Sequence, residues 1–391
     1  MRKNKMRNRE LHNYNDIPVS DTHIHIVFPK APDETVQILR NFNAHFEYDS
    51  IAMQCLTRGS GHRPCDPSNS LKGLYIREML NRERPNFAYV YGSVFHHLDE
   101  KDTPESYLEQ AKTLYALGVD GYKFLDGKPS LRRTLGRPFC DPIYDKMYAF
   151  IEEQRMPVKL HLADPAYFWG PKENLSEWAI KRGWWCGDGT YPTRDEFYEE
   201  TYGILKKFPK LKLTLAHFGF MTYDEAVAFL ENWDNTAFDL TPGAEWCQEV
   251  TKNYEKWKSF FTKYADRIYF GTDTYNEISS DADEETYEKS GARYNTVRKM
   301  LENYPSETFN TGGTLGDFKP LGLERDILEK IYYKNMRALH GNPKPLNRSL
   351  FIECAEKLKD EYLLGVYNIL PENEVEEEIF HLDDMIAKIK M

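Results

Sequence analysis

Two histidines, His23 and His25, lie one residue apart within the largely apolar segment 20–28. Successive side chains of a strand point to opposite faces, so both imidazoles would face one way while Ile24 faces the other. Neutral imidazole nitrogens are common ligands of zinc and similar ions. The pair therefore indicates a metal site, although two polar residues on the solvated face of a strand would give the same pattern.

Four further ionisable residues interrupt apolar segments of strand length. They are Lys123, His161, His217 and Asp273. Three or four histidines together with one carboxylate form a nitrogen and oxygen ligand set that suits zinc, manganese or iron, and does not suit calcium or a thiolate site. If the fold brings these residues to one place, the sequence predicts a divalent metal centre.

Eight segments of strand length alternate with segments of helical spacing between residues 20 and 275. The predicted strands are 20–28, 50–57, 87–95, 119–125, 157–164, 211–219, 236–242 and 267–275. The predicted helices between them are 33–45, 68–81, 103–117, 141–154, 196–208, 223–232 and 251–264.

This alternation predicts an α/β protein with a parallel sheet, and eight strands are the number that closes a (β/α)8 TIM barrel. A doubly wound open sheet is the alternative, but no glycine-rich dinucleotide-binding turn follows the first strand. Barrel enzymes place their chemistry at the carboxyl ends of the strands. The candidate residues above fall at those ends.

The predicted barrel domain covers residues 18–341, with a helix over 324–340 at its end. A polar lead-in occupies residues 1–17. Extra C-terminal helices are predicted over 342–391, where they would pad the barrel or form a subunit contact in a homo-oligomer. The sequence leaves these two roles open.

The chain has 391 residues, a hydrophobic fraction of 41% and a net charge of -11. That charge argues against a nucleic-acid or anionic-membrane partner, and no apolar run of ~18 residues could span a bilayer. The six cysteines form no C-x-x-C pair, which is typical of reduced thiols in a cytoplasmic protein. We therefore expect a cytoplasmic protein whose partner is a small-molecule substrate.

The candidate residues resemble the metal-binding pattern of the amidohydrolase superfamily. The resemblance rests on the His-x-His pair of the first strand, on His161 and His217, and on the aspartate of Gly271-Thr272-Asp273. The helix over 326–339 is similar to one in the amidohydrolase-related branch, and the resemblance covers residues 20–341. It implies a metal-dependent TIM-barrel hydrolase or decarboxylase.

The resemblance also implies a role for each residue of the pattern. The principal metal would be bound by His23, His25, His161 and Asp273. Zinc is the expected metal, with manganese or iron as alternatives. His217 would be a second ligand or would polarise the substrate carbonyl. A bound divalent ion brings the pKa of a water toward ~7, and Asp273 would take the proton of that water as general base.

Lys123 leaves three roles open. Some binuclear members of the superfamily carry a carboxylated lysine on the fourth strand that bridges two metal ions. A lysine on a strand can instead bind a substrate carboxylate as a point charge. It can also pair with a carboxylate of the core, since a desolvated lysine needs a partner. We favour one ion per chain and the second role, with two ions as the alternative.

Residues that follow the strands predict the class of substrate. Arg58 follows the second strand and Arg132 the fourth, while Trp169 and Trp184 lie in a long aromatic loop predicted over 165–195. Arginine binds carboxylates through two hydrogen bonds, and indole rings supply flat apolar walls. We expect a small carboxylate-bearing substrate. In the alternative, the arginines are surface charges and the tryptophans pack the loop onto the barrel.

Together these features predict a metal-dependent hydrolase that attacks an amide, ester or lactone. A non-oxidative decarboxylase is the alternative within the same superfamily, and release of carbon dioxide would distinguish it. A non-catalytic metal- or ligand-binding barrel is the alternative of another class, but a full ligand set with a candidate base exceeds what binding requires.

Overall fold

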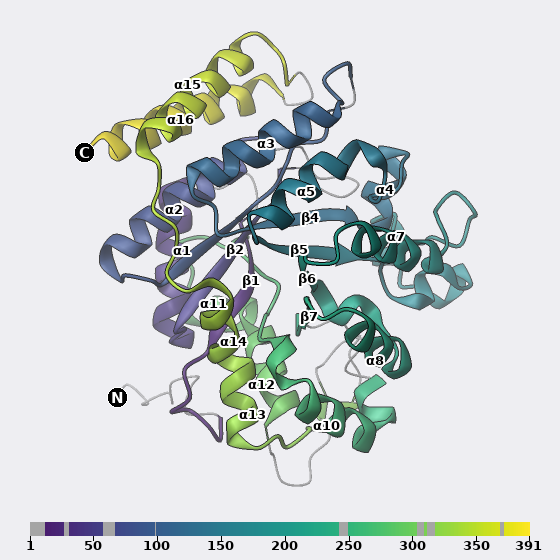
Figure 1. The fold of residues 1–391 in the computed structure, drawn as a ribbon. Helices are drawn as coiled ribbons and strands as arrows, with labels where there is room; N and C mark the ends of the chain where they lie inside the picture. The colour runs from purple at the N-terminus through teal and green to yellow at the C-terminus, as the bar shows by residue number, and fades with distance from the viewer. Residues whose placement is uncertain are drawn as a thin grey trace, which may run out of the picture.

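The computed structural model describes residues 12–26, 31–57, 67–97, 99–241, 249–302, 309–310, 317–367 and 371–391. Within these ranges, nine strands form one parallel sheet in the order β8-β7-β6-β5-β4-β3-β2-β1-β9 (Figure 1). The strands are β1 (Ser20–Ile26), β2 (Ser50–Cys55), β3 (Ala88–Gly92), β4 (Gly121–Gly127), β5 (Pro157–Leu162), β6 (Lys212–Leu215), β7 (Thr236–Asp239), β8 (Ile268–Tyr269) and β9 (Thr274–Tyr275). The predicted α/β class with a parallel sheet is confirmed.

The two ends of the sheet come from one short piece of chain. β8 pairs with β7 and β9 pairs with β1, and only residues 270–273 separate β8 from β9. Between them, the Thr22 N–H donates to the Phe270 carbonyl at 2.9 Å, and the Asp273 N–H donates to the His23 carbonyl at 2.8 Å. The sheet is therefore curled, because its two edge strands, β8 and β9, are joined by only four residues.

Two of the predicted strands are interrupted close to candidate site residues. The strand predicted over 267–275 is divided, because Asp273 has a left-handed φ of 57°. The strand predicted over 211–219 ends at Leu215, and His217 follows with a φ of 56°. Left-handed backbone is unfavourable for residues other than glycine and concentrates at functional sites.

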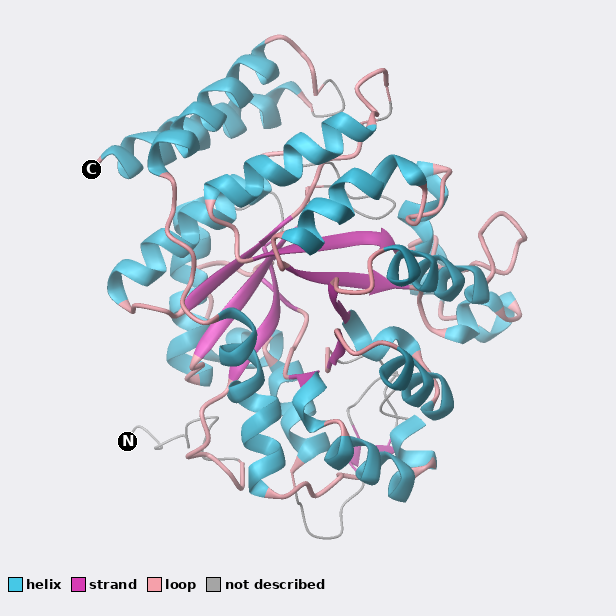
Figure 2. Ribbon diagram, in the orientation of Figure 1, coloured by secondary structure: helices cyan, strands magenta, loops and turns pink. Residues whose placement is uncertain are grey.

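Helices surround the sheet, as Figure 2 shows. They are α1 (Pro32–Phe46), α2 (Asn69–Glu83), α3 (Pro104–Leu117), α4 (Pro129–Leu135), α5 (Asp145–Glu153), α6 (Glu177–Lys181), α7 (Arg194–Lys207), α8 (Tyr223–Asn232), α10 (Tyr254–Lys263), α11 (Glu284–Ser290), α12 (Ala292–Leu301), α13 (Arg325–Glu329), α14 (Asn335–His340), α15 (Arg348–Leu363) and α16 (Glu372–Lys390). A separate antiparallel pair joins β10 (Phe309–Asn310) to β11 (Asp317–Phe318).

Local sequence signals explain where several helices begin and end. The Thr103 side chain accepts a hydrogen bond from the Ser106 N–H at the start of α3, and Gly118 ends that helix with a φ of 96°. Helix α4 was not predicted. The region predicted as a long loop over 165–195 contains short helical turns and α6, because its aromatic side chains form a small core of their own.

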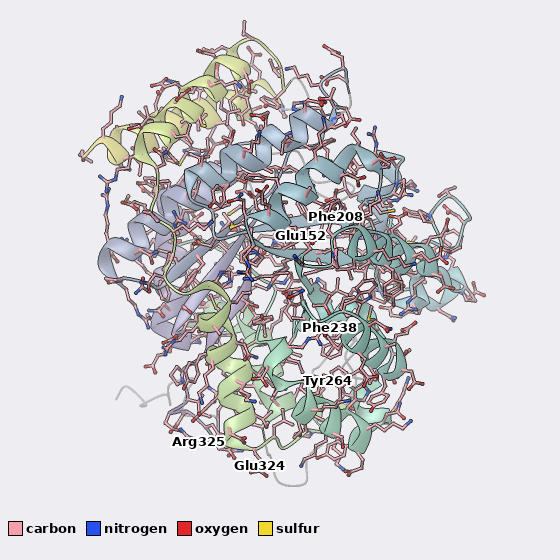
Figure 3. The ribbon with its side chains drawn as sticks, viewed as in Figure 1. Glu152, Phe208, Phe238, Tyr264, Glu324 and Arg325 are labelled. Atoms are coloured by element: carbon pink, nitrogen blue, oxygen red, sulfur yellow. The ribbon has the colours of Figure 1, made fainter. Side chains whose placement is uncertain are left out.

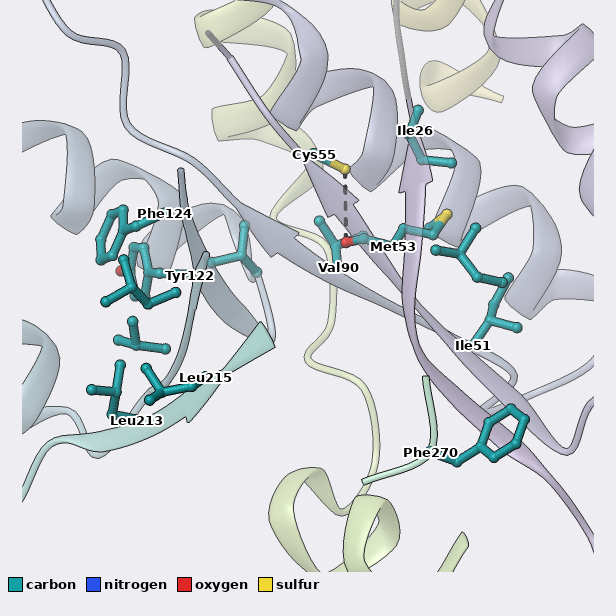
Figure 4. Packing of buried hydrophobic residues seen from close by; sticks show 14 of the residues in the cluster. Ile26, Ile51, Met53, Cys55, Val90, Tyr122, Phe124, Leu213, Leu215 and Phe270 are labelled. Atoms are coloured by element: carbon teal, nitrogen blue, oxygen red, sulfur yellow. Dashed lines mark hydrogen bonds between the residues drawn. The ribbon is translucent and has the colours of Figure 1, made fainter. Parts of the chain in front are cut away.

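The main core lies between the sheet and the helices. In Figure 4, Met53 and Val90 project from β2 and β3, and Leu213 and Leu215 project from β6. All four side chains are buried. Figure 3 shows the same order at the scale of the molecule, with Phe238 toward the middle and the exposed Arg325 at the lower edge. Removing this apolar surface from water supplies most of the drive to fold.

Two further sequence expectations concern thiols and membranes. The cysteines within the described ranges, which are Cys55, Cys140, Cys186 and Cys354, are free thiols. Cys65 and Cys247 lie outside the described residues. In the part of the chain that the structure describes, no helix combines the length and the apolar character needed to cross a bilayer.

The C-terminal residues are helical, as expected, and a buried ion pair fastens α16 to α2. Glu378 accepts a hydrogen bond from Lys72 Nζ at 2.6 Å and another from Ser68 Oγ at 2.7 Å. All three residues are buried. The side-chain amide of the neighbouring Asn69 donates to two backbone carbonyls. One belongs to Ile26, the last residue of β1, and the other to Leu56, which follows β2. The extension thus packs against α2 through Glu378, while both of its proposed roles, as padding of a barrel and as a subunit contact, stay predictions.

We expect Glu378→Ala to destabilise the protein by about 3–5 kcal/mol, because it leaves the Lys72 ammonium buried without its partner. Urea denaturation measures this free energy of unfolding. The matched control is Glu376→Ala, at an exposed glutamate of the same helix, which should change the free energy of unfolding by less than ~0.5 kcal/mol. Equal effects of the two substitutions would contradict the assigned role of the ion pair.

Candidate metal centre

His23, His25 and Asp273 each bring one donor atom to a common point. His25 Nε2 lies 3.1 Å from His23 Nε2 and 3.1 Å from Asp273 Oδ1, and His23 Nε2 lies 3.6 Å from Asp273 Oδ1. An ion bound to all three at ~2.0–2.2 Å would hold such donors ~3.0–3.6 Å apart. Asp273 Oδ1 is buried and accepts no hydrogen bond within the described ranges. The three residues could therefore hold a metal ion.

Strand pairing explains why these three residues meet. His23 and His25 share one face of β1 because side chains alternate along a strand. β9 pairs with β1 so that His25 lies opposite Tyr275. Asp273 immediately precedes β9, and its N–H donates to the His23 carbonyl at 2.8 Å. The carboxylate is therefore held next to the first strand by backbone hydrogen bonds.

Asp239, the last residue of β7, orients His23. Its Oδ2 lies 2.8 Å from His23 Nδ1 and 2.8 Å from Lys159 Nζ. Burial alone would raise the pKa of Asp239, but Lys159 and His23 hold that pKa well below its usual range. An ionised carboxylate accepts the proton of Nδ1, so we assign the tautomer of His23 that leaves a lone pair on Nε2. That lone pair faces the other two donors.

The same carboxylate orients His217 through Thr241. The Thr241 hydroxyl donates to Asp239 Oδ1 at 2.8 Å and lies 2.9 Å from His217 Nδ1. Because the hydroxyl has only one proton, Nδ1 must be the donor in the second contact. Nε2 of His217 therefore carries a lone pair, and burial lowers the pKa of this histidine to about 3. The ring centre lies 5.7 Å from that of His23.

His161 lies close to this group, with its ring centre 4.8 Å from that of His217. Its Nε2 is 3.4 Å from Asp164 Oδ1, which also accepts a hydrogen bond from Lys128. Burial lowers the pKa of His161 to about 4. The structure thus directs this imidazole nitrogen toward Asp164, and the predicted role of His161 as a metal ligand stays a prediction.

Lys123 lies next to His23 and is fully buried, with its Nζ 3.2 Å from His23 Nε2. Burial lowers its pKa to about 7, although the charge of Asp239 opposes the shift. Among the described residues, Lys123 forms no ion pair. The lysine that pairs with a core carboxylate is instead Lys159, on β5. The third role considered for Lys123 is therefore filled by another residue.

The predicted substrate-binding residues make contacts within the protein. Arg132 directs Nε and Nη2 at Glu200, at 3.0 and 2.9 Å. Trp169 Nε1 donates to the Pro192 carbonyl at 2.9 Å. Lys128 Nζ lies 4.8 Å from the ring centre of Trp184. The contacts of the two tryptophans agree with the alternative in which they pack the loop after β5. Arg132 is not the surface charge of that alternative, because its side chain is 14% exposed and paired with Glu200. Arg58 lies outside the described residues.

Four residues of the site were not expected from the sequence: Asp239, Thr241, Lys159 and Arg293. Asp239 ends an apolar strand, so the criterion that selected Asp273 could have found it. Lys159 stands two residues before His161 on one strand, and the period of two places both on one face. No local signal marks Arg293, which lies on α12 and bonds Asp273 Oδ2 at 2.7 Å.

Comparison with known proteins adds a family to this geometry. The family model described as Amidohydrolase matches residues 81–341. The chain belongs to this family. The matched region runs from α2 to the end of α14 and includes His161, His217 and Asp273. No match was found among curated protein sequences.

Solved structures resemble this amidohydrolase-family protein in fold. A protein from Staphylococcus aureus described as an amidohydrolase is 14% identical with a TM-score of 0.50, over 83% of this chain and 100% of that one. A TIM-barrel protein from Bordetella bronchiseptica is 15% identical with a TM-score of 0.49, over 83% and 98%. 2,6-Dihydroxybenzoate decarboxylase from Rhizobium is 13% identical with a TM-score of 0.44, over 83% and 98%.

We expect Asp239→Asn to weaken metal binding by about 10- to 100-fold, because an amide no longer fixes the proton of His23 on Nδ1. Competition with a chromophoric chelator measures the affinity for zinc. The control is Asp49→Asn, whose carboxylate pairs with Arg337 instead of a histidine. Wild-type affinity in a folded Asp239→Asn protein would contradict the assigned role of Asp239.

Proposed function

We propose that this protein is a metal-dependent hydrolase that adds water to an amide, ester or lactone of a small carboxylate-bearing substrate. The observation that carries the proposal is the meeting of His23 Nε2, His25 Nε2 and Asp273 Oδ1 within 4.8 Å of one another. A divalent ion in this position polarises a carbonyl and lowers the pKa of a water. Zinc suits two imidazoles and a carboxylate, with manganese or iron as alternatives.

The chain's own residues divide the remaining tasks. Asp273 engages both of its oxygens, because Oδ1 faces the two histidines and Oδ2 accepts from Arg293 at 2.7 Å. His217 Nε2 carries a lone pair and bonds no other described residue. We propose that His217 Nε2 accepts the proton of the attacking water and delivers it to the leaving group, a task also open to Asp273. Polarising a carbonyl would need a proton on that same Nε2, which the Thr241 contact disfavours.

We also propose that the sheet closes into a (β/α)8 barrel in which β8 and β9 are the two halves of the eighth strand. The hydrogen bonds of Phe270 and Asp273 to β1 support this interpretation, since they continue the pairing across the residues between the halves. A closed barrel would gather the carboxyl ends of all strands at one face. In that barrel, Asp239 at the end of β7 and Asp273 just before β9 would stand at this face, and the imidazole of His23 would reach it from β1.

A non-oxidative decarboxylase is the second candidate, and Lys123 is the observation that favours it. Its Nζ lies 3.2 Å from His23 Nε2, and within the described ranges no carboxylate is paired with it. A substrate carboxylate bound to this buried amine would lie beside the proposed ion. In that reaction the carboxylate leaves as carbon dioxide and a proton replaces it on carbon.

Turnover of a panel of esters, lactones, amides and carboxylic acids in ¹⁸O-labelled water tests the two reactions together. We expect metal-replete protein to place ¹⁸O in the product, and Asp273→Asn to lower kcat/KM by about 10²- to 10⁴-fold, because the substitution removes one anionic donor of the metal and a candidate base. Asp49→Asn should retain wild-type turnover. Release of carbon dioxide without ¹⁸O uptake would favour the decarboxylase, and turnover that survives removal of the metal would contradict both.

A further inference from the structure

Arg293, on α12, joins the candidate metal centre to the outside of the molecule. Its Nη1 donates to Asp273 Oδ2 at 2.7 Å and also to the Asp273 carbonyl. The other oxygen of this carboxylate lies 3.1 Å from His25 Nε2. The guanidinium is therefore separated from the donor atoms by the width of one carboxylate group.

The nitrogen that Arg293 uses is informative, because a guanidinium has more than one hydrogen-bonding edge. The Nε–H and the nearer Nη2–H point the same way in one plane, and their spacing matches the two oxygens of a carboxylate. Three other arginines of this chain direct that edge at a carboxylate: Arg40 at Glu83, Arg132 at Glu200 and Arg337 at Asp49. Arg293 spends only Nη1, and its Nε and Nη2 donate to no described residue.

The side chain that carries this edge is also accessible. The side chain of Arg293 is 44% exposed, whereas that of Asp273 is 11% exposed. An aromatic side chain lies beside the guanidinium, since the Arg293 guanidinium carbon is 5.8 Å from the ring centre of Tyr275. The Tyr275 ring in turn stacks on His25, with ring centres 4.8 Å apart. A ligand that reaches from Arg293 to the donor atoms would therefore run past the flat ring of Tyr275, whose hydroxyl lies 3.5 Å from Asp273 Oδ2.

We propose that the Nε and Nη2 edge of Arg293 binds a carboxylate of the substrate and so determines specificity. The bound carboxylate is a different group from the one that reacts, because the reacting group must lie at the His23, His25 and Asp273 donors. The proposal rests on the proposed function for the carboxylate-bearing substrate. It assigns to Arg293 the role that the sequence suggested for Arg132, whose corresponding edge is occupied by Glu200.

The substrate class that fits is a small molecule with an anionic end, a short apolar spacer and a hydrolysable group. Glutarate and pentanoate mimic two versions of it, because they have the same number of carbons and differ only in whether the second end is a carboxylate or a methyl group. Each probe has a carboxylate that can bind the metal. Only glutarate has a second carboxylate for Arg293.

Calorimetry on metal-replete protein tests this assignment. We expect glutarate to bind the wild-type protein about 10- to 100-fold more tightly than pentanoate, as befits a paired carboxylate. Arg293→Gln should bring the ratio close to one, and Arg293→Lys should lose most of it, because lysine keeps the charge without two parallel donors. Arg337→Gln is the matched control: its side chain is 52% exposed and pairs with Asp49, so the ratio should stay at the wild-type value.

Equal binding of the two probes by the wild type, or an unchanged ratio in metal-loaded Arg293 variants, would overturn the proposal. If both variants lose the metal, the wild-type protein still tests the proposal. Phenylglyoxal modifies accessible arginines, and mass spectrometry then measures how fast each arginine is modified. Glutarate should slow modification of Arg293 and leave Arg337 unaffected, and equal rates at Arg293 with glutarate and pentanoate would overturn it. Binding requires no turnover, so absence of hydrolysis would count against the proposed function without changing these results.

Discussion

The buried carboxylate of Asp239 is the group on which the candidate metal centre depends. It accepts hydrogen bonds from the His23 ring, the His217 N–H and the Thr241 hydroxyl, and it pairs with Lys159 at 2.8 Å. An ionised group in the interior is tolerated only when it is paired and fully hydrogen-bonded. Lys159 supplies the paired charge that Asp239 needs. The remaining contacts of Asp239 and Thr241 then set which ring nitrogen of His23 and of His217 carries the proton.

Backbone strain accompanies this arrangement. His217 and Asp273 both have left-handed φ values, of 56° and 57°. Surrounding hydrogen bonds compensate: the His217 N–H donates to Asp239 Oδ1 at 3.1 Å, and Arg293 holds both the side chain and the carbonyl of Asp273. Strain of this kind persists where the neighbouring structure overdetermines the conformation. The same contacts that tolerate the strain also aim the donor atoms at one point.

The sequence was sufficient for those parts of the account that depend on periodicity. The period of two put His23 and His25 on one face, and the alternation of strands and helices predicted the parallel sheet. Asp239 meets the same criterion as Asp273, since it is an ionisable residue in an apolar strand, so the sequence does contain a signal for it. Arg293 could not be found, because a helix beyond the last strand returns to the site only through tertiary packing. The left-handed backbone at Asp273, which divides the last predicted strand, also depends on tertiary contacts and has no local sequence signal.

The most direct test of the account is a crystal structure of metal-replete protein with anomalous diffraction recorded at the metal edge. We expect one anomalous peak per chain, ~2.0–2.2 Å from His23 Nε2, His25 Nε2 and Asp273 Oδ1, with Lys123 unmodified. Two peaks bridged by a carboxylated Lys123 would contradict the single-ion account. A peak away from these three donors, or none, would contradict the metal centre itself.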